Sequence, residues 1–303
     1  MLGIVILNYM TYEKTFCCIE SIKSTFKKNK KIIIVDNNSA NDSYFKIKKK
    51  YKEDSEITIV KSKENLGYAN GNNIGLRMLK EFNVKYVLVC NNDVIFMENS
   101  IYKLLQCIQE EEAFAVGAQV LDRNKKRQDD SCRNFFGFKE KLFITTPLKI
   151  IDKIKGSPIY NNYYYKDYDY KNRKKVYMLS GCCMLFNYEK FYNLDFFDEN
   201  TFLYEEEAIL FKKAEEHNYK TFIEPKAKII HFHGETTKKM NKPTFGFLIE
   251  SEKYYCKNYL KLKPFKFKIL KTIRVFQILR GFIFSKVYRN DYKKFLKYIF
   301  SKY

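Results

Sequence analysis

The alternation of short apolar runs with amphipathic stretches is the feature that most constrains this fold. Runs rich in β-branched residues at 2–7, 31–35 and 85–90 are typical of strands buried on both faces of a sheet. Residues 57–60 predict a further strand. Between the runs, apolar residues recur at spacings of three and four, which predicts helices. The first 120 residues therefore predict an α/β fold with a doubly wound, mostly parallel sheet.

Helical spacing also predicts which side of each helix is buried. The predicted inner faces are Thr15, Ile19, Ile22 and Phe26; Ile74, Met78 and Phe82; and Ile101, Leu104, Leu105 and Ile108. Asn99 and Ser100 precede the last of these helices, and this pair is expected to cap it.

Polar residues follow each of the three long strands. Asn8 ends the first strand, Asp36 opens a polar run after the second, and Asn91, Asn92 and Asp93 follow the third. Ligands of such sheets bind beyond the carboxyl ends of the strands, so these side chains are expected to share one crevice. Asp36 is placed there to accept hydrogen bonds from a nucleobase or a ribose. For each residue alone, a turn or a helix cap is the competing explanation, because Asn and Asp favour both.

A segment rich in asparagine and glycine, residues 65–75, lies where a strand is expected to lead into a helix. Free backbone N–H groups and a close backbone approach at such a junction suit a phosphate-rich ligand. We expect that ligand to be bound by Asn65, Gly67, Asn70 and Asn72. The chain contains neither GxGxxG nor Gly-Lys-Ser/Thr in this segment, which argues against dehydrogenases and P-loop NTPases.

Two acidic elements are candidates for the chemistry. Asp93 is placed to bind a hard cation, with His231 as a second ligand and substrate phosphates completing the shell; His233 is the weaker candidate. Residues 205–207 are three consecutive glutamates between apolar neighbours, which predicts partial burial. Burial beside a like charge raises the pKa of a glutamate toward that of a general base. The competing explanation is an acidic helix start that complements the helix dipole.

The second half of the chain is less regular. Residues 123–175 are basic and rich in tyrosine and predict an irregular insertion. Residues 176–186 are apolar, a helix is expected over 205–217, and strands are expected near 220 and 228.

The end of the chain combines apolar and basic residues. Residues 268–284 show no clean amphipathic face and are expected to pack as core or to meet a partner. In residues 292–303 the apolar positions have helical spacing and the lysines lie largely elsewhere, which is typical of a helix resting on anionic lipid. The alternative is a helix packed on the domain with a lysine-rich solvent side.

The composition limits the function classes. The 303 residues are 46% hydrophobic and carry a formal net charge of +21, which favours anionic partners without choosing among nucleic acid, lipid and phosphorylated small molecules. No nucleic-acid-binding motif accompanies the charge, so that class is the weaker alternative. The eight cysteines lack zinc-ligand spacing, the N-terminus lacks a basic signal region, and no uncharged apolar stretch is long enough to span a membrane. A cytoplasmic protein is therefore expected.

Taken in order, these motifs resemble those of family 2 glycosyltransferases, in particular the rhamnosyltransferase-like bacterial branch with a GT-A fold. The resemblance covers about residues 2–240 and rests on residues 4–9, 34–39, 64–75, 91–93, 179–185, 197–199, 202–207 and 231–236. Ordered motifs at these intervals are specific to the family, whereas no single one of them would be.

The resemblance implies roles for the acidic residues and one histidine. Asp93 is the surviving acid of the family's metal-binding Asp-x-Asp element, with Asn91 in place of the first acid. Glu207 matches the family's general base, which is more often Asp after Glu, so the choice between Glu206 and Glu207 stays open. His231 lies in the segment that closes over the diphosphate and is the expected second metal ligand.

The same resemblance implies a donor site. Ser180 and Gly181 are expected near the transferred sugar, and Thr236 near the diphosphate. The full set of expected donor-binding residues is Asn8, Asp36, Asn65, Gly67, Asn70, Asn72, Asn91, Asn92, Asp93, Ser180, Gly181 and Thr236.

The implied reaction is transfer of a sugar from a UDP- or dTDP-linked donor to a hydroxyl of a glycan or lipid-linked glycan, with inversion and with Mn²⁺ or Mg²⁺ as cofactor. Cell-surface polysaccharide synthesis is the expected process, on the inner face of the cell membrane. The expected regions are a GT-A domain over 1–245, comprising a nucleotide-binding half (1–120), an insertion (121–175) and an acceptor half (176–245), and a basic, aromatic, helical region over 246–303. Departures from two of the family's acids leave an inactive scaffold as an alternative.

Overall fold

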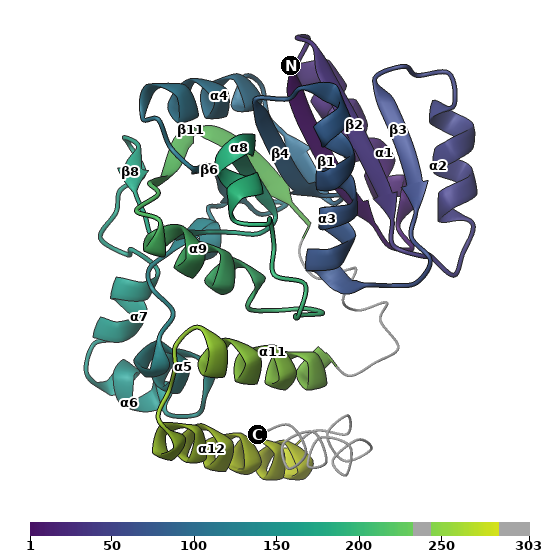
Figure 1. Cartoon of the computed structure of the whole chain (residues 1–303). Helices are drawn as coiled ribbons and strands as arrows, with labels where there is room; N and C mark the ends of the chain where they lie inside the picture. The colour runs from purple at the N-terminus through teal and green to yellow at the C-terminus, as the bar shows by residue number, and fades with distance from the viewer. Residues whose placement is uncertain (233–243, 285–303) are drawn as a thin grey trace.

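The computed structural model describes residues 1–232 and 244–284 of the chain. A nine-stranded sheet forms its centre and carries helices on both faces (Figure 1). The strands of this sheet are β1 (Leu2–Asn8), β2 (Lys30–Asp36), β3 (Ile57–Lys61), β4 (Tyr86–Asn91), β5 (Val94–Phe96), β6 (Ala115–Leu121), β8 (Lys174–Lys175), β10 (Cys183–Asn187) and β11 (Thr221–His231). Their order is β3-β2-β1-β4-β10-β6-β11-β5, with β8 paired to β11. A small second sheet pairs β7 (Cys132–Arg133) with β9 (Met178–Leu179).

The first half of the sheet is parallel, as the alternation of strands and helices predicts. Strands β1 to β4 all run in one direction, and β6 and β11 are parallel to each other. Strand β10 runs against both of its neighbours, β4 and β6, and β5 runs against β11. The predicted doubly wound, mostly parallel sheet is confirmed.

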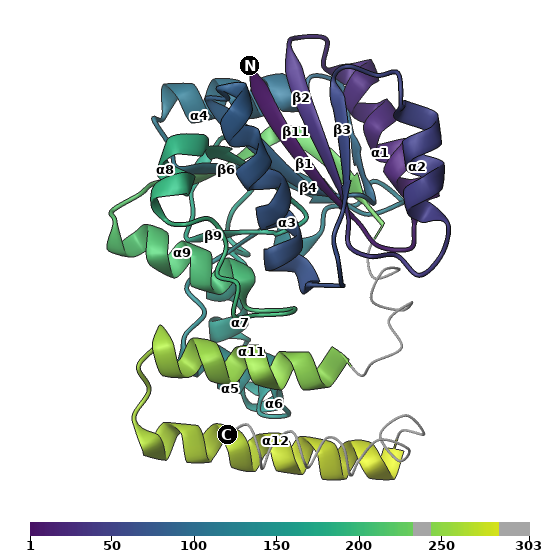
Figure 2. The same ribbon diagram turned by 45° about the vertical axis from the view of Figure 1, so that its right-hand side comes forward.

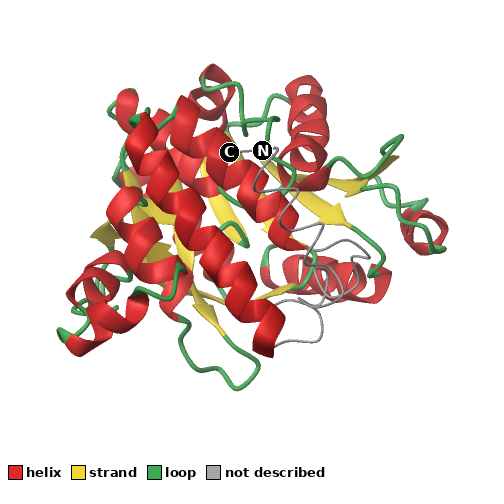
Figure 3. Cartoon of the chain, turned by 90° about the horizontal axis from the view of Figure 1, so that it is seen from below, coloured by secondary structure: helices red, strands yellow, loops and turns green. Residues whose placement is uncertain are grey.

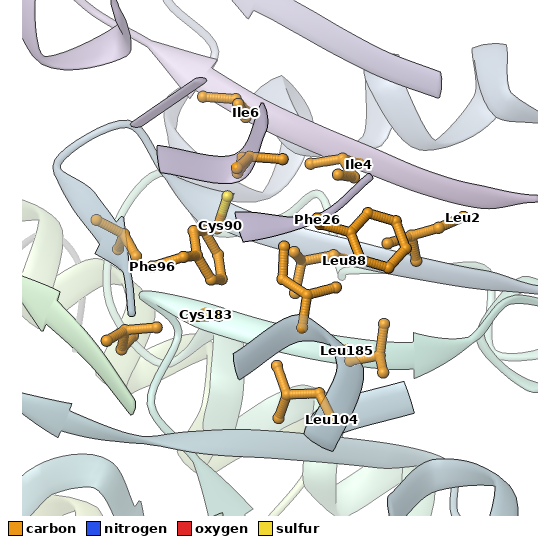
Figure 4. Close-up of a cluster of buried hydrophobic side chains, with 14 of the residues drawn as sticks. Leu2, Ile4, Ile6, Phe26, Leu88, Cys90, Phe96, Leu104, Cys183 and Leu185 are labelled. Atoms are coloured by element: carbon orange, nitrogen blue, oxygen red, sulfur yellow. The ribbon is translucent and has the colours of Figure 1, made fainter. Parts of the chain in front are cut away.

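The helices divide between the two faces of the sheet (Figure 2). Helices α1 (Tyr12–Thr25), α2 (Ser43–Tyr51) and α4 (Ser100–Glu110) cover one face, and α3 (Gly67–Met78), α8 (Tyr188–Asn193) and α9 (Glu206–Glu216) cover the other. The first face buries apolar side chains from the strands and helices alike, and Figure 4 shows ten of them by name, from Leu2 and Phe26 to Leu104 and Leu185. Burial of this kind contributes about 25 cal/mol per Å² of apolar surface, which makes the two cores the main source of stability.

The predicted inner faces of α1 and α4 are confirmed. That of α3 is confirmed in that Ile74, Met78 and Phe82 pack against the core, but the prediction missed the residues that are buried most deeply. Helix α3 buries small residues and Leu76, whereas Ile74 and Met78 are only partly buried. A Cβ on Gly75 would lie 2.7 Å from a methyl carbon of Val5, so the glycines let α3 approach β1 closely. The predicted cap of α4 is also wrong, because the side chain of Asn99 makes no capping hydrogen bond.

The insertion and the last strand differ from expectation. The insertion predicted to be irregular contains three short helices, α5 (Phe138–Thr145), α6 (Lys149–Ile154) and α7 (Pro158–Tyr163). The two strands expected near 220 and 228 form one strand, β11, whose pairing with β6 shifts between Glu224 and Lys228. Pro225 lies in that interval and has no N–H to donate, which accounts for the interruption.

Two further helices, α11 (Thr244–Asn258) and α12 (Pro264–Phe284), lie together with α5 and α6 at the lower end of the molecule (Figures 1 and 2). Seen from below, this end presents helices with the strands behind them (Figure 3). Helix α11 contacts the loop before α9, where Ser251 donates a 2.9 Å hydrogen bond to the carbonyl of Leu203. Within the described residues, no helix is long and apolar enough to cross a membrane.

Candidate active site

Three strand ends are tied together by buried side chains. Asn8, at the end of β1, donates a 2.7 Å hydrogen bond to Asp36 at the end of β2. Its amide oxygen accepts hydrogen bonds from Thr15 and from Asn92, which follows β4. Asp36 also accepts hydrogen bonds from the backbone N–H and the hydroxyl of Ser39. The predicted convergence of the polar strand ends is confirmed.

The structure gives these buried residues a different role from the predicted one. Asn8 and Asp36 have no exposed surface, and Asn92 is 3% exposed. The carboxylate of Asp36 is occupied by Asn8 and Ser39, so in this conformation it holds the strand ends in place and does not face a nucleobase or ribose. Burial of a carboxylate requires such donors, which explains the polar residues around it.

A narrow cavity lies beside this cluster. It is lined by Leu7, Tyr9, Asn37, Asn65, Gly67, Tyr68, Asn91, Asn92, Phe202 and Leu203. The amide of Asn37 donates 3.0 Å hydrogen bonds to Asn65 Oδ1 and to the carbonyl of Gly67, which fixes one wall. Aromatic rings and amide groups together suit a planar heterocycle with a hydrogen-bonding edge.

A glycine is required at position 67 because the loop before α9 approaches the start of α3 closely. The φ of Gly67 is +79°, and a Cβ there would lie 2.0 Å from the carbonyl oxygen of Phe202. The next residue, Tyr68, donates its backbone N–H to the same oxygen at 2.9 Å. Glycine therefore lets α3 begin against the loop that leads to α9.

Asn70 and Asn72 are not among the residues that line the narrow cavity. Asn70 donates a 2.8 Å hydrogen bond to the carbonyl of Glu199, and Asn72 donates one of 2.9 Å to the carbonyl of Tyr68. Both lie within helix α3, past its first residues, whereas Asn65 and Gly67 precede or begin it. Asn70 and Asn72 thus make contacts within the protein, and their contacts with the donor stay a prediction.

A larger cavity of about 360 Å³ continues from the narrow one. Its lining is Tyr68, Asn91, Asp93, Asp130, Arg133, Ser180, Gly181, Cys182, Leu203, Tyr204, Glu206, Glu207 and His231. Tyr68, Asn91 and Leu203 belong to both cavities, so the two are neighbouring parts of one crevice. Six predicted site residues besides Asn91 thus line one space: Asp93, Ser180, Gly181, Glu206, Glu207 and His231.

Asp93 and His231 face each other in this cavity. Asp93 follows β4, His231 ends β11, and His231 Nε2 lies 3.2 Å from Asp93 Oδ1. Burial favours the neutral ring, but interactions with Cys182 and Asp93 favour the charged form and raise the pKa of His231 to about 10. The carboxylate of Asp93 is the stronger of these two influences on the pKa of His231, because a thiol is neutral at pH 7.

The residues present fit a divalent cation held jointly with a ligand. The carboxylate of Asp93 is buried and faces the cavity beside His231, so both side chains are placed to coordinate one cation. A carboxylate oxygen and an imidazole nitrogen suit Mn²⁺ or Mg²⁺, which commonly take further oxygens from substrate phosphates. Among residues 1–232 and 244–284, no group of three His, Cys, Asp or Glu forms a complete protein cage. His233 and Thr236 lie outside the described residues.

The three consecutive glutamates have three different environments. Glu205 is buried and forms an ion pair with Lys141 of α5. Glu206 is 3% exposed, and its Oε1 has no hydrogen-bond partner in the described structure. The side chain of Glu207 is 23% exposed toward the cavity. The predicted partial burial is confirmed, and it separates the three carboxylates by accessibility.

Glu207 is held by two donors. Its Oε1 accepts a 3.0 Å hydrogen bond from the backbone N–H of Gly181 and lies 3.3 Å from an Arg133 nitrogen. A Cβ on Gly181 would lie 2.5 Å from that oxygen, so the close approach requires glycine. The other oxygen of Glu207 takes part in none of these contacts.

Glu206 is set apart from its neighbour by protonation. Burial first, and then the charge of Glu207, raise the pKa of Glu206 to about 8. At neutral pH Glu206 therefore holds a proton, while Glu207 beside the Arg133 guanidinium is the carboxylate placed to receive one.

Three residues important to this site escaped the sequence reasoning. Tyr68 donates a 2.6 Å hydrogen bond to the carbonyl of Gly181 and so links the two cavities. Arg133 and Lys141 come from the insertion and pair with Glu207 and Glu205. Nothing in the local sequence of the insertion distinguishes these two cations from its many others, but the need of buried carboxylates for partners is a signal that some of them would be used.

Comparison with known proteins relates this chain to glycosyltransferases. The chain is 26% identical over 136 residues to the glycosyltransferase GlyG of Streptococcus pneumoniae, covering 45% of this chain and 42% of GlyG. It is 25% identical over 218 residues to the low-salt glycan biosynthesis hexosyltransferase Agl10 of Haloferax volcanii, covering 72% of this chain and 62% of Agl10. The chain thus spans less than two thirds of the length of either relative.

Solved structures share the fold at low identity. GalNAc-T7 with UDP, GalNAc and Mn²⁺ matches 86% of this chain and 48% of its own at a TM-score of 0.60 and 11% identity. Staphylococcus aureus TarS 1-349 with UDP-GlcNAc matches 98% of this chain and 81% of its own at a TM-score of 0.56 and 14% identity. The family model for glycosyl transferase family 2 matches residues 4–195, which is more than half of the chain. The chain therefore belongs to glycosyl transferase family 2.

Proposed function

We propose that this chain is an inverting glycosyltransferase that moves one sugar from a UDP- or dTDP-linked donor to a hydroxyl of a glycan or lipid-linked glycan in cell-surface polysaccharide synthesis. The observation that carries the proposal is that Asp93 and Glu207 line one cavity, which continues into the narrow amide-lined one. Sugar transfer needs a diphosphate site and an acceptor base on two sides of the sugar, and this crevice offers both. The rhamnosyltransferase-like branch is part of the proposal.

The narrow cavity is the proposed nucleotide site. Asn65 presents its amide group for the edge of a base, and Tyr9 and Phe202 present rings for its face. UDP and UDP-GlcNAc are ligands named for GalNAc-T7 and TarS, which supports a uridine donor and leaves dTDP as the alternative.

The larger cavity is the proposed site of the sugar and its acceptor. Ser180 and Gly181 line it beside Glu207, whose carboxylate is placed to take the proton of the acceptor hydroxyl. Arg133 and the Gly181 N–H hold one oxygen of Glu207, which orients the other. A single displacement at the anomeric carbon inverts its configuration.

Asp93 and His231 are the proposed protein ligands of Mn²⁺ or Mg²⁺. A cation bound there would neutralise the diphosphate as it leaves. His231 must be neutral to ligate, so cation binding would release its proton. The presence of Mn²⁺ with UDP in GalNAc-T7 supports this assignment.

The proposed organisation follows the predicted boundaries, with residues 1–245 as the catalytic domain and 246–303 as a basic C-terminal region. Phe247 of α11 stacks on Phe202 at 4.2 Å between ring centroids, so this region would also support the loop before α9. The interfacial helix predicted over 292–303 lies outside the described residues.

A donor screen tests the proposal. UDP- and dTDP-sugars are added with Mn²⁺, and both the melting temperature and the released nucleoside diphosphate are measured. We expect one donor to raise the melting temperature and to be slowly hydrolysed, and we expect EDTA to abolish both effects. Asp93→Ala should lose the Mn²⁺-dependent part of the shift, whereas the exposed control Asp167→Ala should keep it.

The same screen separates the enzyme from an inactive scaffold. If a folded chain binds donor but cleaves none of the panel, with or without acceptor glycans, the scaffold alternative gains and the transferase proposal fails. If no nucleotide sugar binds at all, the assignment of the narrow cavity fails as well.

A further inference from the structure

The outermost helix, α12, carries an apolar stripe on its exposed side. Phe265, Ile269, Phe276 and Leu279 are 57%, 40%, 65% and 46% exposed. At 3.6 residues per turn these four positions fall within a sector of about 80°. The structure thus shows four large apolar side chains on one exposed side of this segment, with the exposed Thr272 among them.

The orientation of this stripe is fixed from the opposite side of the helix. Leu270 and Arg274 are buried, and Arg274 makes hydrogen bonds of 3.0 and 2.7 Å to Glu252 of α11. Arg274 also donates to the carbonyl and hydroxyl oxygens of Thr145 at the end of α5. A buried ion pair is costly to break, so α12 is held with its arginine inward and its aromatic residues outward.

Basic residues flank the stripe. Lys268 and Arg280 are exposed, Lys266 and Lys271 are partly exposed, and the sequence of α12 contains no acidic residue. An apolar stripe between cations is the pattern of a helix that lies in the interface of a membrane.

We propose that this face of α12 docks on an anionic lipid surface. The stripe supplies apolar area for the acyl boundary, and the flanking cations supply attraction to acidic headgroups. A second copy of the chain fits less well, because a symmetric contact through this face would bring two sets of cations together. A nucleic acid would leave the exposed phenylalanines without an apolar environment.

A second set of exposed apolar residues lies at the same end of the molecule. Ile150, Ile151 and Ile154 of α6 are 52%, 43% and 79% exposed, and the six residues of this helix include two lysines. Helices α6 and α12 lie at the lower end in both Figure 1 and Figure 2. The insertion therefore offers an additional contact with the same kind of surface.

The docking surface deepens the proposed function by giving the acceptor a location, and in that respect it rests on the proposed function. Helix α11 lies between α12 and the loop before α9: it contacts Arg274 through Glu252 and Leu203 through Ser251. Packed helices lie 8–10 Å apart, so the lipid surface would lie roughly 20 Å from the loop before α9. A glycan carried on a lipid can cover that distance.

Vesicle flotation with the full chain tests the proposal. The vesicles contain phosphatidylcholine with an equal part of phosphatidylglycerol, or phosphatidylcholine alone. We expect binding to the anionic vesicles, and a loss of roughly 10-fold or more in Phe265→Ser/Phe276→Ser. The matched control is Phe45→Ser, whose ring is 66% exposed on α2. Lys268→Gln/Arg280→Gln should weaken binding by roughly 10-fold and reduce its salt dependence.

Several outcomes would overturn the docking surface. One is that the wild-type protein does not bind anionic vesicles. Another is that Phe265→Ser/Phe276→Ser binds these vesicles like the wild type, whereas truncation after residue 284 abolishes binding. A chain that dimerises, and that the double variant makes monomeric without any vesicle binding, would assign the stripe to a second copy. Circular dichroism checks folding, and donor hydrolysis in the same preparations tests the transferase separately, since α12 lines neither cavity.

Discussion

The ends of strands β1 and β2 and the start of helix α9 both carry buried polar side chains, but these side chains differ in how their polar atoms are paired. At the strand ends, Asn8 and Asp36 are fully buried and bind each other. At the start of α9, Glu206 is nearly as buried but has an oxygen without a hydrogen-bond partner in the described structure, and Glu207 is partly exposed. Burial alone therefore does not distinguish the two regions, whereas the pairing of polar atoms does.

This difference in pairing is the basis on which we assign some carboxylates to the fold and propose others for the chemistry. A buried polar atom without a partner lowers stability, and native structures keep few of them. Here Glu206 Oε1 and Arg133 Nε belong to that group, and both residues line the larger cavity. Atoms left unpaired around one cavity are best explained by a ligand that would pair them, which is a hypothesis about function.

The largest expected effect is on the rate, at Glu207. Glu207→Gln keeps the shape of the side chain but removes the base, so we expect turnover to fall by about 10²–10⁴-fold with donor affinity unchanged. The comparison is with Glu216→Gln, an exposed position at the other end of α9. Turnover is measured with donor and acceptor at saturation.

The neighbouring carboxylate decides whether the assignment is right. Glu206→Gln should lower turnover far less than Glu207→Gln, because Glu206 is already protonated at neutral pH. If the two variants exchange these effects, Glu206 is the base and the division between the carboxylates is reversed.

The next largest effect is on stability, at Asp36. Asp36→Ala removes the acceptor of the hydrogen bonds from Asn8 and Ser39. Three such bonds, at about 1 kcal/mol each, predict a loss of roughly 3 kcal/mol in the free energy of unfolding. Urea denaturation measures it, with the exposed Asp42→Ala as control. Full stability combined with lost donor affinity would show that Asp36 contacts the nucleotide. The proposed difference between Asp36 and the glutamates at the start of α9 would then be wrong.

The sequence predicts the first half of the molecule better than the second for a physical reason. Strands β1, β2 and β4 are buried on both faces, so their apolar runs and polar ends are visible in the sequence. Whether a polar end faces a ligand or a neighbour depends on atoms elsewhere in the chain, so the sequence could not show that Asp36 bonds to Asn8 and Ser39. Arg133 reaches Glu207 across 74 positions, and no local pattern encodes such a contact.

A smaller effect concerns the pH dependence of stability. Because the pKa of Glu206 is raised from 4.5 to about 8, the folded chain holds a proton between these values that the unfolded chain has lost. Stability from this group is therefore greatest below pH 4.5 and declines as the pH rises to about 8. We expect Glu206→Gln to be close to the wild type in stability at pH 5 and to exceed it by up to about 4 kcal/mol at pH 9. Urea midpoints at both pH values measure the difference in stability between the two proteins. The same difference at pH 5 and at pH 9 would mean that Glu206 is ionised in the folded chain.

The smallest expected effect tests the asparagine-rich segment, where neighbouring residues of one type divide between the two roles. Asn65 lines the narrow cavity, whereas Asn70 donates only to the carbonyl of Glu199. Losing one hydrogen bond worth about 1 kcal/mol weakens binding roughly fivefold. Asn65→Ala should therefore raise the dissociation constant of the donor by about that factor, and Asn70→Ala should leave it unchanged while lowering stability slightly. Calorimetric titration of the nucleoside diphosphate with Mn²⁺ measures both, and a donor defect at Asn70 alone would mean that the start of α3 changes when the nucleotide binds.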